Sequence, residues 1–128
     1  MRKTLDIETA LYDRLTSDNY SASAHAVPAT LGSSLPHIHV MRTGGNNTSV
    51  VIDVHQVDFD VYAVDQADAM TAACDLCGWV RDLVGEDIGA ICYRSEVMTL
   101  PYGNPDPRHP TLGRATLKAQ ILTRTKGD

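Results

Sequence analysis

One segment of the sequence, VDFDVYAV at residues 57–64, limits the possible folds more than any other. Its apolar residues alternate with polar ones, a pattern typical of a β-strand with one face in the core. The chain continues as DQADAM, where Asp65 is a suitable N-cap and the apolar positions then recur every three or four residues. The segment therefore predicts a strand that leads directly into an amphipathic helix. We expect this helix to end near Val84, before Gly85, and to pack on the sheet that contains the strand.

The remaining elements follow from caps, turn residues and apolar periodicity. We predict a first helix from Leu5 to Leu15 with Thr4 as its N-cap, and a long ordered loop with the sequence PYGNPDPRHPTLG. The other predicted strands are a short one within 20–27, His37–Arg42, Ser49–His55, Ile88–Leu100 and Arg114–Thr125, with a turn at Thr43–Thr48. The sequence therefore predicts one α+β domain over residues 1–128, with a mixed or antiparallel sheet of about five strands and two main helices.

Composition restricts the cellular setting. The N-terminal sequence MRKTLDIETALYDRL is charged throughout, and no later segment has the ~20 apolar residues of a membrane span. The three cysteines are an odd number, which favours free thiols over a set of disulfides. We expect a cytoplasmic protein that does not contact membranes.

Charge is distributed unevenly along the chain. Residues 53–87 contain nine acids and one base, whereas residues 88–128 contain six bases and three acids. An acidic patch and a basic patch on one subunit suit head-to-tail self-association, in which the two patches of neighbouring copies meet. Solvated charged faces with no partner are the alternative reading.

No motif indicates an enzyme. Cys74 and Cys77 form a C-x-x-C pair, but they fall in the middle of a predicted helix and not at its N-terminus, where a reactive thiolate is stabilised. The Gly44–Asn47 segment lacks the Lys and Ser or Thr of a P-loop. His37, His39 and Asp58 are the basis of the alternative reading, a small metal- or ligand-binding domain. We expect no catalytic residue, no cofactor and no bound metal.

Four segments carry a resemblance to one protein family: LPHIHVMRTGG, VIDVHQVDFDVYAVDQADAM, the helix with Trp79-Val80-Arg81, and LPYGNPDPRHPTLGRATLKAQILTR. Together they resemble the tail terminator proteins of long-tailed, non-contractile bacteriophages. The resemblance implies a hexameric ring that caps the head-proximal end of the tail tube, stops tube polymerisation and forms the surface on which the head docks. A head-completion or connector protein from the same neck region is the alternative within this setting.

The resemblance also implies partners and contact residues. The partners would be further copies of the chain, the tail tube protein and the head connector proteins, while genome DNA passes through without specific binding. The protein would reside in the host cytoplasm during assembly and then in the virion neck. The implied contact residues are Gly44, Gly45, Asn46 and Asn47 in the first turn, and Tyr102, Asn104, Asp106 and Arg108 in the last loop.

Charge patterning adds four residues. We expect Arg114 and Lys118 on the last strand to meet the acidic patch of a neighbouring subunit. We expect the outward carboxylates Asp58 and Asp60 to line the DNA channel, where they would repel phosphate and let DNA slide.

Overall fold

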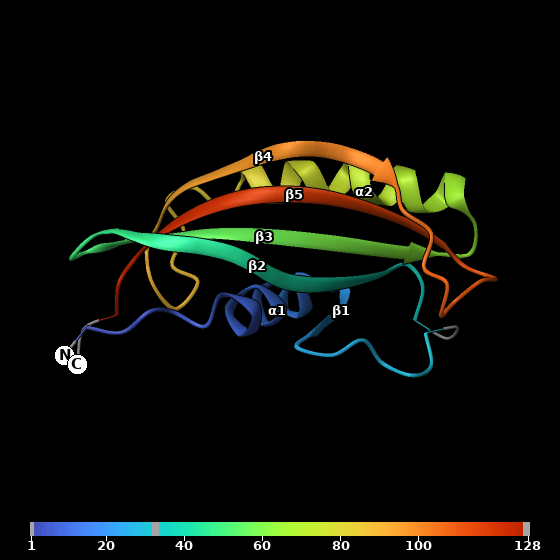
Figure 1. Ribbon diagram of the computed structural model, residues 1–128, viewed down its shortest axis with the longest axis horizontal. Coiled ribbons are helices and arrows are strands. Elements are labelled where there is room, and N and C mark those ends of the chain that lie inside the picture. The colour runs from blue at the N-terminus through green and yellow to red at the C-terminus, as the bar shows by residue number, and fades with distance from the viewer. Residues whose placement is uncertain (1, 32–33, 127–128) are drawn as a thin grey trace.

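The computed structural model describes residues 2–31 and 34–126, and it contains two helices and one five-stranded sheet (Figure 1). The strand order is β1-β2-β3-β5-β4, with β1 parallel to β2 and the other pairs antiparallel. The elements are α1 (Ile7–Ser17), β1 (Ser21–Ala24), β2 (His37–Ser49), β3 (Ile52–Ala63), α2 (Gln66–Arg81), β4 (Cys92–Gly103) and β5 (Gly113–Arg124). The predicted single α+β fold with a mixed sheet is confirmed.

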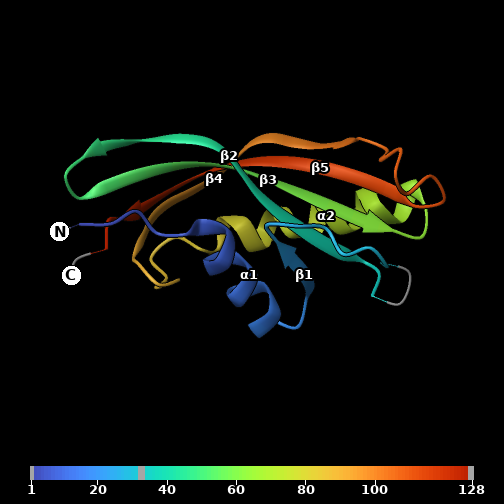
Figure 2. The same ribbon diagram turned by 60° about the horizontal axis from the view of Figure 1, so that its bottom comes forward.

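Both helices cover the same face of the sheet, as the turned view shows (Figure 2). The predicted alternation in β3 is confirmed for this face, because Val57, Phe59, Val61 and Ala63 are all buried in one core cluster. Ile38 and Val40 of β2 belong to the same cluster, as do the apolar residues of both helices. The opposite face of the sheet carries no helix and is polar.

The helix boundaries differ slightly from the prediction. Thr4 is not the cap of α1, because the chain around it is still extended and Lys3 pairs with Lys126. Asp6 is the cap, and one of its carboxylate oxygens accepts from the backbone N–H of Thr9 at 3.3 Å. The predicted cap of α2 is confirmed, because Asp65 accepts from the N–H of Asp68 at 2.8 Å. This helix ends at Arg81, earlier than predicted.

The predicted turn at Thr43–Thr48 is wrong, and the predicted strand Ser49–His55 is confirmed only from Ile52. The Gly-Gly segment is not the turn: β2 continues to Ser49, the chain reverses at 50–51, and β3 is a single strand from Ile52. Two register shifts, between Arg42 and Gly44 and between Asn47 and Ser49, absorb the irregular backbone. The result is a long hairpin that projects beyond the helices (Figure 1).

Gly45 is needed in this hairpin, whereas its neighbour Gly44 is not. Gly45 has a φ of +138°, and a Cβ there would lie 2.1 Å from the carbonyl oxygen of Val54, while a Cβ on Gly44 would meet nothing within 4 Å. We expect Gly45→Ala to lower the free energy of unfolding by about 1–3 kcal/mol, because backbone strain is added to a collision. Gly44→Ala, the matched control, should change it little. Urea denaturation of both variants checks this, and equal effects would contradict it.

Candidate interaction site on the polar face and the hairpin

Polar side chains form two rows across the face of the sheet that the helices leave open. Strand register places them opposite one another, since partners in adjacent strands project to the same side. The first row is Ser21, His37, Tyr62 and Arg114, and the second is Ser23, His39, Asp60 and Thr116. Residues of the same row are up to 93 positions apart in the sequence, so sheet topology alone brings them together.

Two serines and two histidines form a continuous hydrogen-bonded chain along β1 and β2. Ser21 Oγ lies 2.8 Å from His37 Nδ1, His37 Nε2 lies 2.9 Å from Ser23 Oγ, and Ser23 Oγ lies 2.8 Å from His39 Nδ1. Both histidines are buried. They lie on the other face of β2 from the core residues Ile38 and Val40, and they hold the short edge strand β1 to β2 through its serines. Among the described residues, no group of three or more His, Cys, Asp or Glu could hold a metal ion.

Arg114 is the centre of a second network, at the end of the sheet where β3 finishes and β5 begins. Its Nη1 lies 3.5 Å from an oxygen of Asp106, 4.0 Å from an oxygen of Asp60, and 3.4 Å from the hydroxyl of Tyr62. Tyr62 donates to Asp106 at 2.8 Å, and Thr116 donates to Asp60 at 2.7 Å. The network fastens the 104–112 loop to the sheet.

The expectation that Asp58 and Asp60 are exposed, outward carboxylates is therefore wrong. Asp60 is buried, and Asp58 is paired with Lys118 of its own chain at 2.9 Å. In the antiparallel register Asp58 lies directly opposite Lys118, and Tyr62 directly opposite Arg114. Lys118 and Arg114 are thus already paired with acids in the subunit, so the charge argument for a contact with a neighbour's acidic patch loses its basis.

A cleft of about 560 Å³ opens beside this network, between the 25–29 and 106–109 segments. Its walls include four of the predicted site residues, Asp60, Asp106, Arg108 and Arg114. Asn104 joins the same network, donating to Thr116 at 3.0 Å. Tyr102 lies one strand away, opposite Thr116. Sequence reasoning missed His25, His109 and Tyr62 in this cleft.

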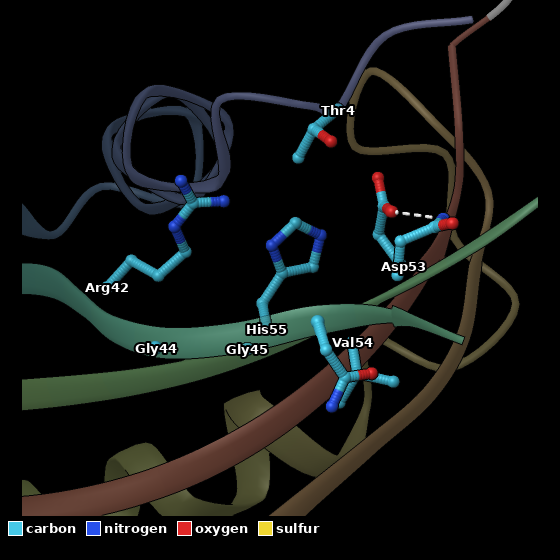
Figure 3. Close-up of a pocket in the computed structure, with 9 residues that line it drawn as sticks. Thr4, Arg42, Gly44, Gly45, Asp53, Val54 and His55 are labelled. Atoms are coloured by element: carbon cyan, nitrogen blue, oxygen red, sulfur yellow. Dashed lines mark hydrogen bonds between the residues drawn. The ribbon is translucent and has the colours of Figure 1, made fainter. Parts of the chain in front are cut away.

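The other predicted contact residues lie at the far end of the molecule, in the hairpin. Gly44, Gly45, Asn46 and Asn47 line a pocket of about 350 Å³ on the helix-bearing side (Figure 3). Thr4 and Arg42 stand at its rim, and Asp53 and His55 of β3 form its floor. The structure therefore divides the predicted site residues between two separate places. The alternation of β3, extended backwards from Val57, was a signal that could have placed His55 and Asp53 on one face.

The edge strand β4 carries a third candidate surface. It is the last strand of the sheet, and several of its large apolar side chains are exposed, among them Leu100 at 67% and Met98 at 56%. Tyr93 and Tyr102 are also exposed. Exposed apolar side chains on an edge strand are typical of a protein–protein contact.

The C-x-x-C pair has no reactive geometry. Cys74 is exposed and Cys77 is buried, and both lie within α2. Burial raises the pKa of Cys77, and also that of Cys92 on β4, so both thiols stay protonated at neutral pH. No helix of the described chain is both long and apolar enough to cross a membrane.

Three buried histidines make the stability depend on pH. Burial lowers the pKa of His37, His39 and His55 below the ordinary value of 6.5. The unfolded chain therefore binds more protons than the folded chain once the pH falls below about 6.5. We expect the free energy of unfolding to be constant just above that pH and to fall below it, by up to about 1.4 kcal/mol per pH unit for each histidine.

Urea denaturation at several pH values between 8 and 5 checks this prediction. The variant His39→Gln removes one titrating group, so its stability should fall less steeply over the same range. A wild-type protein whose stability is flat from pH 7 to pH 5 would contradict the assignment of these histidines as neutral buried groups.

No protein-family model matches the chain, and a search of curated proteins gives no match. The class that the fold defines is a small two-layer α+β domain.

Proposed function

We propose that this protein is a structural subunit that assembles with further copies of itself, as a tail terminator of a long-tailed, non-contractile bacteriophage. In this role six copies form a ring on the head-proximal end of the tail tube. The ring stops tube polymerisation and presents the surface for head connector proteins. Assembly takes place in the host cytoplasm, and the ring then stays in the virion neck.

One observation carries the proposal beyond the sequence resemblance. Strand β4 leaves its outer edge unpaired over Cys92–Gly103 within the described chain, and it exposes apolar side chains there. Exposed apolar side chains on an open sheet edge support a subunit contact better than they support catalysis. The long hairpin and the 104–112 loop project from opposite ends of the sheet, which supports a head-to-tail arrangement of copies (Figure 1).

The role proposed for Asp58 and Asp60 in the channel is weakened. A lumen repels DNA through unpaired negative charge, and these two carboxylates face Lys118 and Arg114 of their own chain. DNA passage through the ring stays part of the proposal without these residues.

Native mass spectrometry and light scattering of the purified protein test the proposal. We expect a hexamer that dissociates as protein concentration falls. The functional test adds the protein to polymerising tail tube protein, and tubes should stop growing at a capped end.

Binding assays with the same purified protein distinguish a tail terminator from a head-completion or connector protein. Binding to tail tubes and not to portal-bearing heads supports the terminator, whereas the reverse supports a head-completion or connector protein. A chain that neither assembles nor binds either structure would overturn both.

A further inference from the structure

The hairpin pocket contains a buried carboxylate with no cation beside it. Asp53 is 3% exposed, and its Oδ1 accepts from the side-chain amide of Asn47 at 2.8 Å. Its Oδ2 is buried with no hydrogen-bond partner, and Asp53 has no ion pair within the described residues. Buried carboxylates are normally paired with a cation or fully hydrogen-bonded, because removing a charge from water is costly. The Oδ2 atom of Asp53 therefore lacks a hydrogen-bond donor.

A second side chain of the pocket floor is also incompletely bonded. His55 is 1% exposed, its Nε2 is 2.9 Å from the hydroxyl of Thr123, and its Nδ1 has no partner. In Figure 3 the ring lies between Arg42 on one side and Asp53 on the other. Arg42 therefore faces the histidine and leaves the carboxylate without a cation. The Asp53 side of the pocket is acidic, and Asp53 is one of the residues that line the pocket wall.

The missing group must supply N–H donors and positive charge. A metal ion is a poor fit, because the described residues around Asp53 include no cluster of three ligands. A guanidinium group fits well, since its planar set of five donors can bond a carboxylate and a neighbouring acceptor together. The pocket of about 350 Å³ has room for such a group.

The chain itself contains one arginine in the position that a head-to-tail contact requires. Arg108 is exposed, and no carboxylate of the described residues lies within 4.0 Å of its guanidinium. Its backbone is nevertheless fixed, because its N–H donates to Asp106 at 3.0 Å. The 104–112 loop lies at the opposite end of the long axis from the hairpin (Figure 1).

Other bases without an ion pair in the described chain lie nearer the pocket's own end. Residues 2–3 and 124–126, the pocket residue Arg42, and the C-terminal end of α2 with Arg81 are all on the hairpin side of the molecule. A contact between two surfaces at the same end can be two-fold and close a dimer, whereas a contact between opposite ends is heterologous and can continue around a ring. Arg108 is the base that can serve the second arrangement.

We propose that the pocket formed by Asp53, His55 and Asn47 receives the guanidinium of Arg108 from a second copy of the chain, with Asp53 Oδ2 as its acceptor. This inference rests on the proposed self-assembly and names the contact that would carry it. The contact is heterologous, with the hairpin of one subunit against the loop of the next.

Charge-neutralising variants of the full chain test the contact. We expect Asp53→Asn and Arg108→Gln each to weaken self-association by at least about ten-fold, since each leaves a charged partner unpaired in the interface. Arg81→Gln, which removes another exposed arginine, is the matched control and should leave association unchanged. Asp53→Asn should not lower the thermal midpoint of the monomer, because it removes an unpaired buried charge.

A mixture of the two variants gives a sharper result. Asp53→Asn keeps an intact loop and Arg108→Gln keeps an intact pocket, so an equimolar mixture can form one native contact. We expect a heterodimer in the mixture and no closed ring, whereas each variant alone stays monomeric at the same concentration.

Two results would overturn the inference, and they differ in what they leave standing. Variants that assemble into hexamers as well as Arg81→Gln does would overturn the pocket contact and leave the ring function intact. A wild-type protein that stays monomeric at every concentration would overturn the contact between free copies, and the tube-capping assay would then decide the proposed function separately.

Discussion

Replacing Arg114 by methionine is expected to lower the free energy of unfolding by about 3–5 kcal/mol, the usual cost of removing one partner from a buried ionic network. Arg114 has a side chain only 16% exposed, and Asp60 and Asp106 beside it are 11% and 10% exposed. Methionine keeps the apolar stem but leaves both carboxylates with no cation nearby. Asp106 already depends on such partners, because hydrogen bonds from Arg108 and Tyr62 and the charge of Arg114 hold its pKa below the ordinary value despite burial.

The ion pair of Lys118 provides the matched control. Lys118 pairs with Asp58 on the next strand at 2.9 Å, but its side chain is 43% exposed. Lys118→Met should therefore change the free energy of unfolding by less than about 1 kcal/mol, as is usual for exposed pairs. Urea denaturation at pH 7 measures both variants. Equal losses of unfolding free energy in the two variants would contradict the role of Arg114 as the cation of a buried ionic network.

Loss of Arg114 should also affect assembly. Arg114 donates to the backbone carbonyl of Asn104 and contacts Asp106, so it fixes both the start and the middle of the loop that carries Arg108. In the proposed head-to-tail contact, a loosened loop loses more conformational entropy when it becomes ordered on binding. Arg114→Met should accordingly associate more weakly than Lys118→Met at temperatures where both are folded.

Local patterns predicted the fold class and the core strand correctly because their physical causes are local. The alternation of Val57, Phe59, Val61 and Ala63 depends only on strand geometry. The cap at Asp65 depends on a side chain three residues from the N–H that it bonds. Such features need no knowledge of the rest of the chain.

The polar face could not be predicted in the same way. Whether Asp58 faces solvent or a lysine depends on which strand lies beside β3 and in which register, and the neighbouring strand β5 comes 50 residues later. The same holds for the pairing of Ser21 and Ser23 with His37 and His39 across a parallel edge. The strand register is set by the whole sheet. It places carboxylates that were predicted to be exposed next to basic or hydroxyl partners.

The hairpin was wrongly predicted for a different reason. Two adjacent glycines followed by two asparagines are a common turn signal, but here Gly45 lets the strand pass close to the backbone of Val54 and continue. Asn47 then bonds the carbonyl of Ile52 and the carboxylate of Asp53 across the hairpin. The signal for an unusual backbone was correct, and its interpretation as a chain reversal was not.

Replacing Phe59 by alanine should destabilise the fold about as much as loss of Arg114, by about 3–5 kcal/mol. Phe59 is the only phenylalanine, it is fully buried on the central strand β3, and its ring meets Trp79 of α2 edge to face at 6.2 Å between ring centres. It lies between Val40 and Leu117 on the adjacent strands, so a cavity there cannot close without moving the sheet or the helix.

Phe59→Leu is the matched control for this position, and it should cost less than about 1.5 kcal/mol because most of the apolar volume remains. Urea denaturation measures both variants on monomeric protein. A loss below about 1 kcal/mol for Phe59→Ala would contradict the packing of α2 against β3. Because Phe59 is remote from the Asp53 pocket and from the 104–112 loop, folded Phe59→Leu protein should associate like wild type, which separates defects of the core from defects of the proposed contact.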